Sequence, residues 1–197
     1  NKPEEIDPGV PNYYASTYMD GGEYCSVLVK TREGRPIFIE GNSYSSVTKG
    51  GTNPRVNASV LGLYDIEKAK NPSKNGEETT WDTIDSEVPR LLAQLSAAGK
   101  GIRIVSNTIL SPSTKKVIKQ FADKFPGTEH VSYDAQSCYG ITEAHKRMFG
   151  SAVIPAYALE KSKVIVGIDA DFLGSWYAGV EHSVAYAQTR KVEADNP

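Results

Sequence analysis

Cysteine is scarce in this 197-residue chain, which contains only Cys25 and Cys138. Two thiols cannot supply a metal site with four cysteine ligands, and the sequence does not show whether they lie within disulfide range. The three histidines, His130, His145 and His182, lack the i, i+4 spacing of helical metal ligands. We therefore expect surface or partly buried histidines and no metal site.

The chain also lacks a strong charge of one sign and a long apolar run. Lys and Arg total 22 and Asp and Glu total 24, a net charge of −2, so no basic field predicts binding to nucleic acid. The longest apolar run, Val164–Ile168, is far shorter than the roughly 18 residues of a membrane span. No signal peptide follows Asn1, and because this residue is not Met we expect a piece of a longer protein.

What is present is an ordinary globular composition, 39% hydrophobic and 23% charged. Residues 1–12 are rich in proline and acidic residues and are predicted to form an extended lead-in. Two β-rich runs, Tyr24–Lys30 and Arg35–Glu40, flank a short loop with Gly34 and predict a hairpin. Asn53 before a proline predicts a helix start after a polar loop. We interpret 13–80 as a small β-rich unit.

Residues 81–197 alternate between helical and strand patterns. Such alternation is typical of a parallel α/β sheet, and Lys163–Ile168 resembles a strand buried on both faces. The predicted fold class is therefore α/β, with the β-rich unit followed by a Rossmann-like unit that need not be complete. The expected elements are a helix over 85–98, a strand over 102–105, a helix from Ser111, a strand over 129–133, a helix over 142–149, a strand over 163–168 and a helix over 181–191.

Small polar residues follow two of these strands, where open α/β sheets bind ligands. Ser106, Asn107 and Ser111 follow the first strand, and Asp169 and Asp171 follow the last. They are candidates for a ligand-binding edge. Ser111 is equally suited to cap a helix, and both aspartates are suited to bind their own backbone in a turn.

No motif supplies catalytic chemistry. Gly99-Lys100-Gly101 precedes a strand and does not open a helix, so it is not a dinucleotide fingerprint, and no Walker A motif or nucleophile elbow is present. We assign no catalytic residue. A cluster of tyrosines that includes Tyr13, Tyr14 and Tyr18 has no basic residues interleaved, which argues against a nucleic-acid platform.

Several segments resemble the front part of molybdopterin-dependent oxidoreductases of the DMSO reductase type. Those enzymes bind an iron–sulfur cluster through C-x2-C-x3-C before a hairpin and a fourth cysteine before a helix. The resemblance covers most of residues 13–190. The matching segments are Cys25–Lys30, Glu33–Ile37, Glu40–Asn42, Leu63–Asp65, Thr80–Asp82, Glu160–Val166 and Ala170–Trp176.

Two further segments, Tyr13–Tyr18 and Ser106–Pro112, are similar to one branch of that family. The branch is the fused molybdopterin-like and iron–sulfur subunit of bacterial alternative complex III, a quinol-oxidising membrane complex. Its Bacteroidetes members are described as twin-arginine-variant translocated. The resemblance implies electron transport on the periplasmic side of the bacterial inner membrane, with other subunits and the rest of the same polypeptide as partners.

The sequence departs from the family at the cluster ligands. The four ligand positions correspond to Tyr18, Gly21, Cys25 and Asn53, so three thiolates are missing. Iron–sulfur clusters require thiolates or, in some centres, histidine. We therefore expect no cofactor in this chain: the resemblance places clusters in a later domain of the parent, and this branch is expected to lack molybdopterin.

The leading hypothesis is a structural module of a quinol-oxidising complex that is not catalytic by itself, with Tyr13, Tyr14, Tyr18 and Trp176 as candidate interface residues. Two alternatives remain. The chain could supply part of the cofactor pocket of an active molybdopterin-dependent oxidoreductase. It could also be a binding module for a small nucleotide-like ligand near Ser111, because helix N-termini attract anions.

Overall fold

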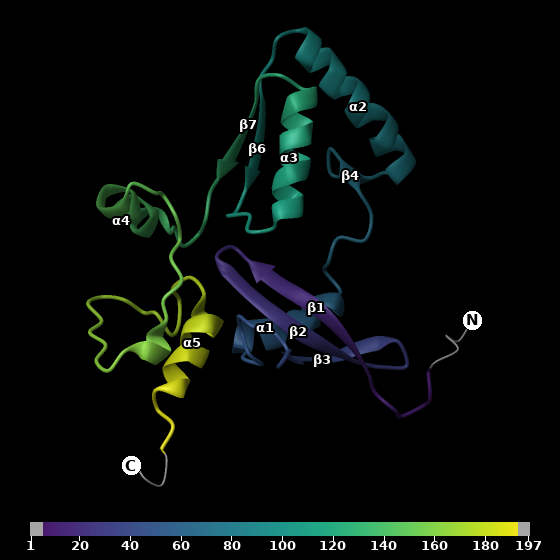
Figure 1. Ribbon diagram of the computed structural model, residues 1–197. Helices are drawn as coiled ribbons and strands as arrows, with labels where there is room; N and C mark the ends of the chain where they lie inside the picture. The colour runs from purple at the N-terminus through teal and green to yellow at the C-terminus, as the bar shows by residue number, and fades with distance from the viewer. Residues whose placement is uncertain (1–5, 193–197) are drawn as a thin grey trace. The chain divides into compact units, whose positions relative to one another are not determined.

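The computed structural model describes residues 6–192 and has a mixed α/β fold (Figure 1). An antiparallel three-stranded sheet near the N-terminus is followed by a two-stranded parallel sheet. The chain divides into two compact units. The hairpin unit joins the residues up to Tyr64 with those from Gln136 onward, and the α/β unit is Asp65–Ala135. The first boundary of this division lies at 64/65, whereas the predicted boundary is at 80/81. In addition, the segment from Gln136 onward belongs to the same unit as the N-terminal sheet.

Three antiparallel strands, in the order β1-β2-β3, form the sheet of the hairpin unit. The predicted hairpin of β2 (Glu23–Arg32) and β3 (Arg35–Gly41) is confirmed. Its two turn residues both have positive φ, as a type I′ turn requires, and the second is Gly34. The first strand, β1 (Asn12–Asp20), was not predicted, although the tyrosines within it favour a strand.

The core of the hairpin unit lies between β2, β3 and two short helices, α1 (Pro54–Ala58) and the 3₁₀ helix η1 (Ser59–Leu63). Asn53 caps α1 as predicted, since its Oδ1 accepts a hydrogen bond from the Val56 N–H at 2.9 Å. Val56 and Val60 are buried, whereas Leu63 at the end of η1, where the helix has 3₁₀ geometry, is 51% exposed. The buried cluster contains Cys25, Val27, Ile39, Val56, Val60 and Val180.

The α/β unit contains one βαβ element, formed by β6 (Ile102–Ser106), α3 (Pro112–Lys124) and β7 (Thr128–Ser132). The two strands pair in parallel, as the alternating pattern predicts. The sequence also predicted the start of α3, where Ser111 Oγ accepts from the Thr114 N–H at 3.3 Å. Before this element lie a short hairpin of β4 (Ser73–Lys74) and β5 (Glu77–Glu78) and the helix α2 (Trp81–Ala97).

The helix α2 begins four residues earlier than predicted, because the Thr80 side chain caps it. Its apolar residues recur at helical spacing, a pattern typical of a helix that buries one face. No residue of α2 is buried in the described part of the chain, and Val88 and Leu91 remain 41% and 53% exposed. Helical periodicity thus predicted the element correctly but not the partner that would cover it.

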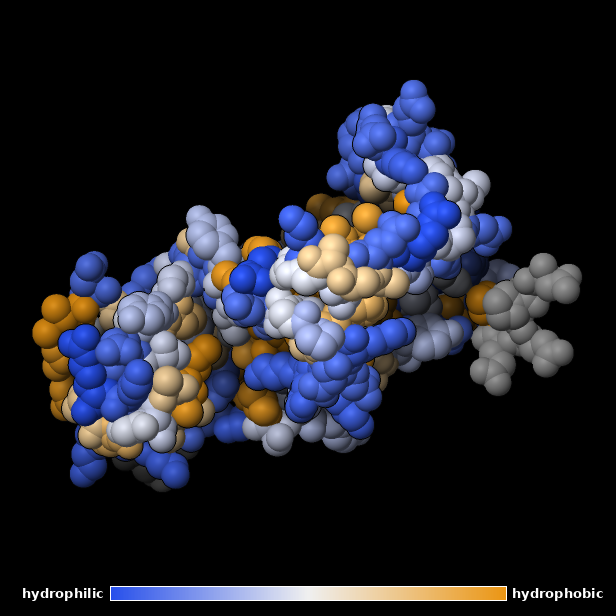
Figure 2. Space-filling model, turned by 90° about the horizontal axis from the view of Figure 1, so that it is seen from above, coloured by the Kyte–Doolittle hydropathy of each residue, from blue (hydrophilic) through white to orange (hydrophobic). Residues whose placement is uncertain are grey.

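The predicted buried strand over 163–168 is wrong. This segment has no strand assignment, and Val164, Val166 and Ile168 are 80%, 79% and 86% exposed. A strand needs a neighbouring edge, and this segment belongs to the hairpin unit instead of the unit with the parallel sheet. Hydrophobic side chains are visible at the surface in several places in Figure 2.

The C-terminal part of the hairpin unit contains α4 (Tyr139–Phe149), the 3₁₀ helix η2 (Leu159–Lys161) and α5 (Gly179–Gln188). The helices α4 and α5 were both predicted. The predicted start of α4 was three residues too late, and that of α5 was two residues too late. Among residues 6–192, none of the helices combines the length and the apolar character needed to cross a bilayer.

Candidate functional site

The four positions that the resemblance aligns with cluster ligands lie in the hairpin unit, on the first hairpin and at the start of α1. Tyr18 and Cys25 are directly opposite each other on β1 and β2. Gly21 is in the two-residue turn that joins those strands, with φ +53°. Asn53 is the N-cap of α1.

Cys25 is the single thiol among the four positions, and it is fully buried. Its Sγ donates a hydrogen bond to the Gly51 carbonyl at 3.3 Å. Burial raises the pKa of the thiol, and the nearby Glu23 carboxylate raises it further. Cys25 is therefore held as a neutral core thiol, which is the opposite of what a metal-binding thiolate requires.

The other three positions do not fit an iron–sulfur cluster either. The Asn53 side-chain oxygen accepts from the Val56 N–H, the Tyr18 hydroxyl donates to Asp20 Oδ2 at 3.5 Å, and Gly21 has no side chain. Iron in these clusters needs thiolate or imidazole ligands. The donor set of these four positions contains one thiol and therefore does not match the ligands of an iron–sulfur cluster.

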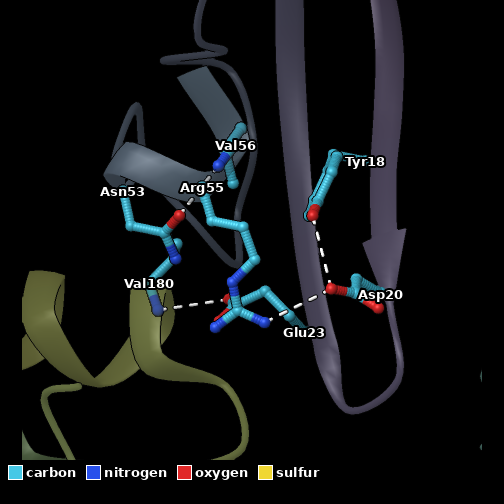
Figure 3. A network of polar contacts seen from close by, with 7 residues as sticks. All are labelled: Tyr18, Asp20, Glu23, Asn53, Arg55, Val56 and Val180. Carbon is cyan, nitrogen blue, oxygen red and sulfur yellow. Dashed lines mark hydrogen bonds and ion pairs between the residues drawn. The ribbon is translucent and has the colours of Figure 1, made fainter. Parts of the chain in front are cut away.

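A polar network surrounds these positions (Figure 3). Arg55, which follows the cap of α1, pairs with Asp20 at the end of β1, with Nη1 and Oδ2 3.3 Å apart. The Tyr18 hydroxyl reaches the same carboxylate oxygen, and burial followed by the charge of Asp20 raises the pKa of Tyr18. Both members of the ion pair are about half exposed, so the pair is screened by water.

Glu23 is the buried member of this region and joins the hairpin to α5. It is 3% exposed, and its Oε1 accepts from the Val180 N–H at 3.2 Å, in the first turn of α5. The residue at the N-cap position of α5, Ala178, supplies no side-chain cap, so the carboxylate of Glu23 takes that role. Beside it, the Ala178 N–H donates to the Gly22 carbonyl at 3.2 Å.

Burial raises the pKa of Glu23, and the N–H groups of Val180 and Gly179 and the charge of Arg55 oppose that rise. The other carboxylate oxygen, Oε2, has no hydrogen-bond partner in the described part of the chain. Glu23 thus lies in a nearly dry position at a helix terminus, where the effect of burial on its pKa exceeds that of the groups favouring its charged form. The contact between the hairpin and α5 therefore includes a titratable side chain, Glu23.

An aromatic cluster surrounds His182, which is 1% exposed and therefore more buried than expected from the sequence. Its Nδ1–H donates to the Phe172 carbonyl at 3.2 Å, and burial lowers its pKa. The ring lies within 5.3–6.1 Å of the rings of Tyr157, Trp176 and Tyr177. The candidate interface residue Trp176 is half buried in this cluster, and its main contacts are within the chain.

The five candidates for a ligand-binding edge are not brought to one sheet edge. Ser106, Asn107 and Ser111 belong to the α/β unit. Ser106 Oγ lies 2.8 Å from His130 Nε2 and donates to the Asn107 carbonyl at 2.7 Å, while Ser111 caps α3. Their hydroxyls are thus used locally.

Asp169 and Asp171 belong to the hairpin unit, and the strand expected to carry them to a sheet edge is not formed. Asp171 accepts from both the N–H and the hydroxyl of Ser175 at 2.8 Å, and the backbone hydrogen bond lowers the pKa of Asp171. Asp169 has φ +48° in a bend. Both act as turn residues, which was one of the two interpretations of the sequence.

The tyrosines of β1 differ in exposure. Tyr13 is 48% exposed and Tyr14 is 55% exposed, whereas Tyr18 is half buried against the core. Tyr13 lies under the Lys30 ammonium, with Nζ 5.6 Å from the ring centroid. Of the candidate interface residues, Tyr13 and Tyr14 therefore have the more exposed side chains.

Sequence reasoning missed the residues that organise this region, Asp20, Glu23 and Arg55. The signal available was the pair of glycines between two acidic residues, which is typical of a hairpin turn and would have revealed β1. Nothing in the sequence links Glu23 to a helix that begins at Gly179. That contact exists only in the folded chain.

The described residues contain no group of three or more His, Cys, Asp or Glu side chains placed to hold a metal ion. Comparison of the sequence with protein-family models and with curated proteins finds no match.

Proposed function

We propose that this chain is a cofactor-free structural module of a molybdopterin oxidoreductase-like subunit, within a quinol-oxidising electron-transfer complex on the periplasmic side of a bacterial inner membrane. In this proposal the α/β unit is the first part of a Rossmann-like domain, which the parallel β6–α3–β7 element supports. Redox centres would lie in later parts of the polypeptide and in other subunits, and this chain would contribute docking surface.

One observation supports the structural role above the others. The positions that would hold a cluster have non-ligand side chains, and each side chain that is present already has a partner within the chain. The Cys25 thiol donates to Gly51, Asn53 caps α1, and Tyr18 bonds Asp20. The buried Glu23 carboxylate beside them joins the hairpin to α5. Hydrogen bonds and an ion pair therefore perform the cross-linking that a cluster performs in the family this chain resembles.

Iron and molybdenum analysis tests the proposal. We expect neither metal, and no visible charge-transfer absorption, in the anaerobically purified chain, and iron without molybdenum in the full-length parent. Stoichiometric iron bound to this chain would overturn the cofactor-free role. Stoichiometric molybdenum in the parent would overturn the structural role and favour the alternative in which the chain forms part of a cofactor pocket.

A rebuilt ligand set tests the assignment of the four positions. The variant Tyr18→Cys/Gly21→Cys/Asn53→Cys retains Cys25 and restores the C-x2-C-x3-C spacing and the fourth ligand. After anaerobic reconstitution with iron and sulfide we expect cluster absorption in this variant and none in the unmodified 197-residue chain. The matched control places the three new cysteines at Ser43, Ser45 and Ser46, in the loop of the same unit. Equal iron uptake by both variants would contradict the assignment.

A further inference from the structure

The outer edge of β1 is the least protected strand edge in the hairpin unit. Proteins usually blunt an exposed edge with proline, a bulge, charged residues or a covering element. The opposite edge, β3, has most of these devices. Pro36 removes one N–H, the register shifts at Lys30/Thr31, the Tyr64 hydroxyl occupies the Pro36 carbonyl, and α1 and η1 pack against the strand.

By contrast, β1 has nine residues, a continuous register with β2 and no proline. No charged residue occurs before Asp20 at its end. No other element packs extensively against it among the described residues. Long, uncharged and uncovered edges are the ones that accept an additional strand.

The register shows which backbone groups of β1 face away from β2. In a hairpin with a two-residue turn, the flanking residues form a hydrogen-bonded pair, so Asp20 and the other even-numbered residues of β1 bond to β2. The Asn12 carbonyl agrees with this phase, because it accepts from the Thr31 hydroxyl on β2. The N–H and C=O groups that point to the open edge are those of Tyr13, Ala15, Thr17 and Met19.

The side chains on the core face of β1 also lack complete cover. Tyr18 and Ser16 lie opposite the buried Cys25 and Val27, so the even-numbered residues share the face of the core. Tyr14 is on that same face and is nevertheless 55% exposed. A further strand beside β1 would cover the exposed ring of Tyr14 on this face of the sheet.

We propose that β1 pairs in an antiparallel manner with β1 of a second copy of this chain, which joins the two three-stranded sheets into one of six strands. The two-fold axis lies at Ser16. This register places Tyr14 opposite Tyr18 of the second copy, and aromatic pairs across strands are favourable. It places Asp20 opposite Asn12, whereas a parallel, in-register pair would place two Asp20 carboxylates side by side. The pairing goes beyond the proposed function, because it requires only a second copy.

Disulfide trapping of the full chain tests the register. Residues at a non-hydrogen-bonded position on the axis have Cα atoms about 4.5 Å apart, within the range of about 4.4–6.8 Å that disulfides span. We expect Ser16→Cys to form a covalent dimer at least about tenfold faster than Ser86→Cys, an exposed control in α2. The parent chain, which retains Cys25 and Cys138, sets the background.

Sedimentation equilibrium over a wide protein concentration range tests the pairing itself. We expect a reversible monomer–dimer equilibrium. Thr17→Pro removes an N–H that points to the open edge and leaves the ladder to β2 intact, so it should weaken the dimer by about tenfold or more. Thr17→Val keeps the N–H and should leave the dimer unchanged. Circular dichroism shows whether both variants are folded.

Three results would overturn the proposal. The first is an unmodified chain that stays monomeric at every concentration. That result would also be obtained if the natural partner of β1 were a strand of a different protein, and it would overturn the pairing with a second copy. Another is a dimer that Thr17→Pro does not weaken although the variant is folded. The third is a cross-linking rate of Ser16→Cys that does not exceed the rate of Ser86→Cys. This comparison does not depend on whether Thr17→Pro folds.

Discussion

Replacing Glu23 with alanine should loosen the start of α5 while leaving the α/β unit unchanged. The change removes the acceptor of the Val180 N–H, and Val180 is 1% exposed, so water cannot easily replace the carboxylate. Loss of a helix cap costs about 1 kcal/mol, and a buried N–H without a partner costs about 1–3 kcal/mol. Removal of a poorly hydrated carboxylate offsets part of this cost. We expect a net loss of about 1–2 kcal/mol in the free energy of opening α5.

Amide hydrogen exchange measured by mass spectrometry is the appropriate assay, because it reports α5 separately from α2 and α3. Peptides of α5 should lose protection in Glu23→Ala, and peptides of the α/β unit should serve as an internal control. Glu181→Ala is the matched variant: it removes an acidic residue from the same first turn, but one without a hydrogen bond to that turn. Equal loss of protection in both variants would refute the capping role of Glu23.

The pH dependence of α5 stability gives a second test of the same residue. Because the pKa of Glu23 is raised in the folded chain, the folded state binds more protons than the unfolded state between the two pKa values. The contribution of Glu23 is therefore fully present below its unfolded pKa and is lost as the pH rises through the folded pKa. The difference in opening free energy between the parent and Glu23→Gln should grow as the pH falls from 7 toward about 4.5. A difference that is constant with pH would show that Glu23 does not titrate in this range.

Three other predictions follow from single contacts. Asn53→Ala should cost about 1 kcal/mol of hairpin-unit stability in urea unfolding, while Asn57→Ala, on the same helix without the cap, should cost less; equal effects would contradict the capping role. Arg55→Met should raise the pKa of Glu23 further and move the pH dependence of α5 exchange to higher pH, and an unchanged profile would contradict the influence of Arg55. Trypsin should cleave after Lys163 before it cleaves after Lys30, because the first lies outside any ladder and the second is within β2; the reverse order would contradict the irregular conformation of 163–168.

Local patterns in the sequence predicted most of the individual elements. The alternation in β2 and β3, the positive-φ turn at Gly34, and the caps Asn53 and Ser111 depend on neighbours within a few residues. Their energies are local, so the sequence contains the information needed. The missed strand, β1, is a partial exception, because its tyrosines and the glycine pair after it were local signals too.

The segment over 163–168 was predicted wrongly because its conformation depends on residues far away in the sequence. Its composition favours a strand, but a strand forms only when another edge satisfies its backbone hydrogen bonds, and the sequence does not specify that edge. The same limit applies to the helix α2. The spacing of its apolar residues predicts which face of the helix is apolar, but it does not predict which other surface covers that face.

The sequence alone determined that Tyr18, Gly21 and Asn53, three of the four positions that the resemblance aligns with cluster ligands, cannot provide thiolates. The tertiary structure decided which contacts the side chains of this region make. It brings Glu23 to the first turn of α5 across 157 positions of sequence and buries Cys25 as a neutral thiol. Ligand chemistry is a property of side-chain type, whereas burial and long-range hydrogen bonds depend on which distant segments the fold places together.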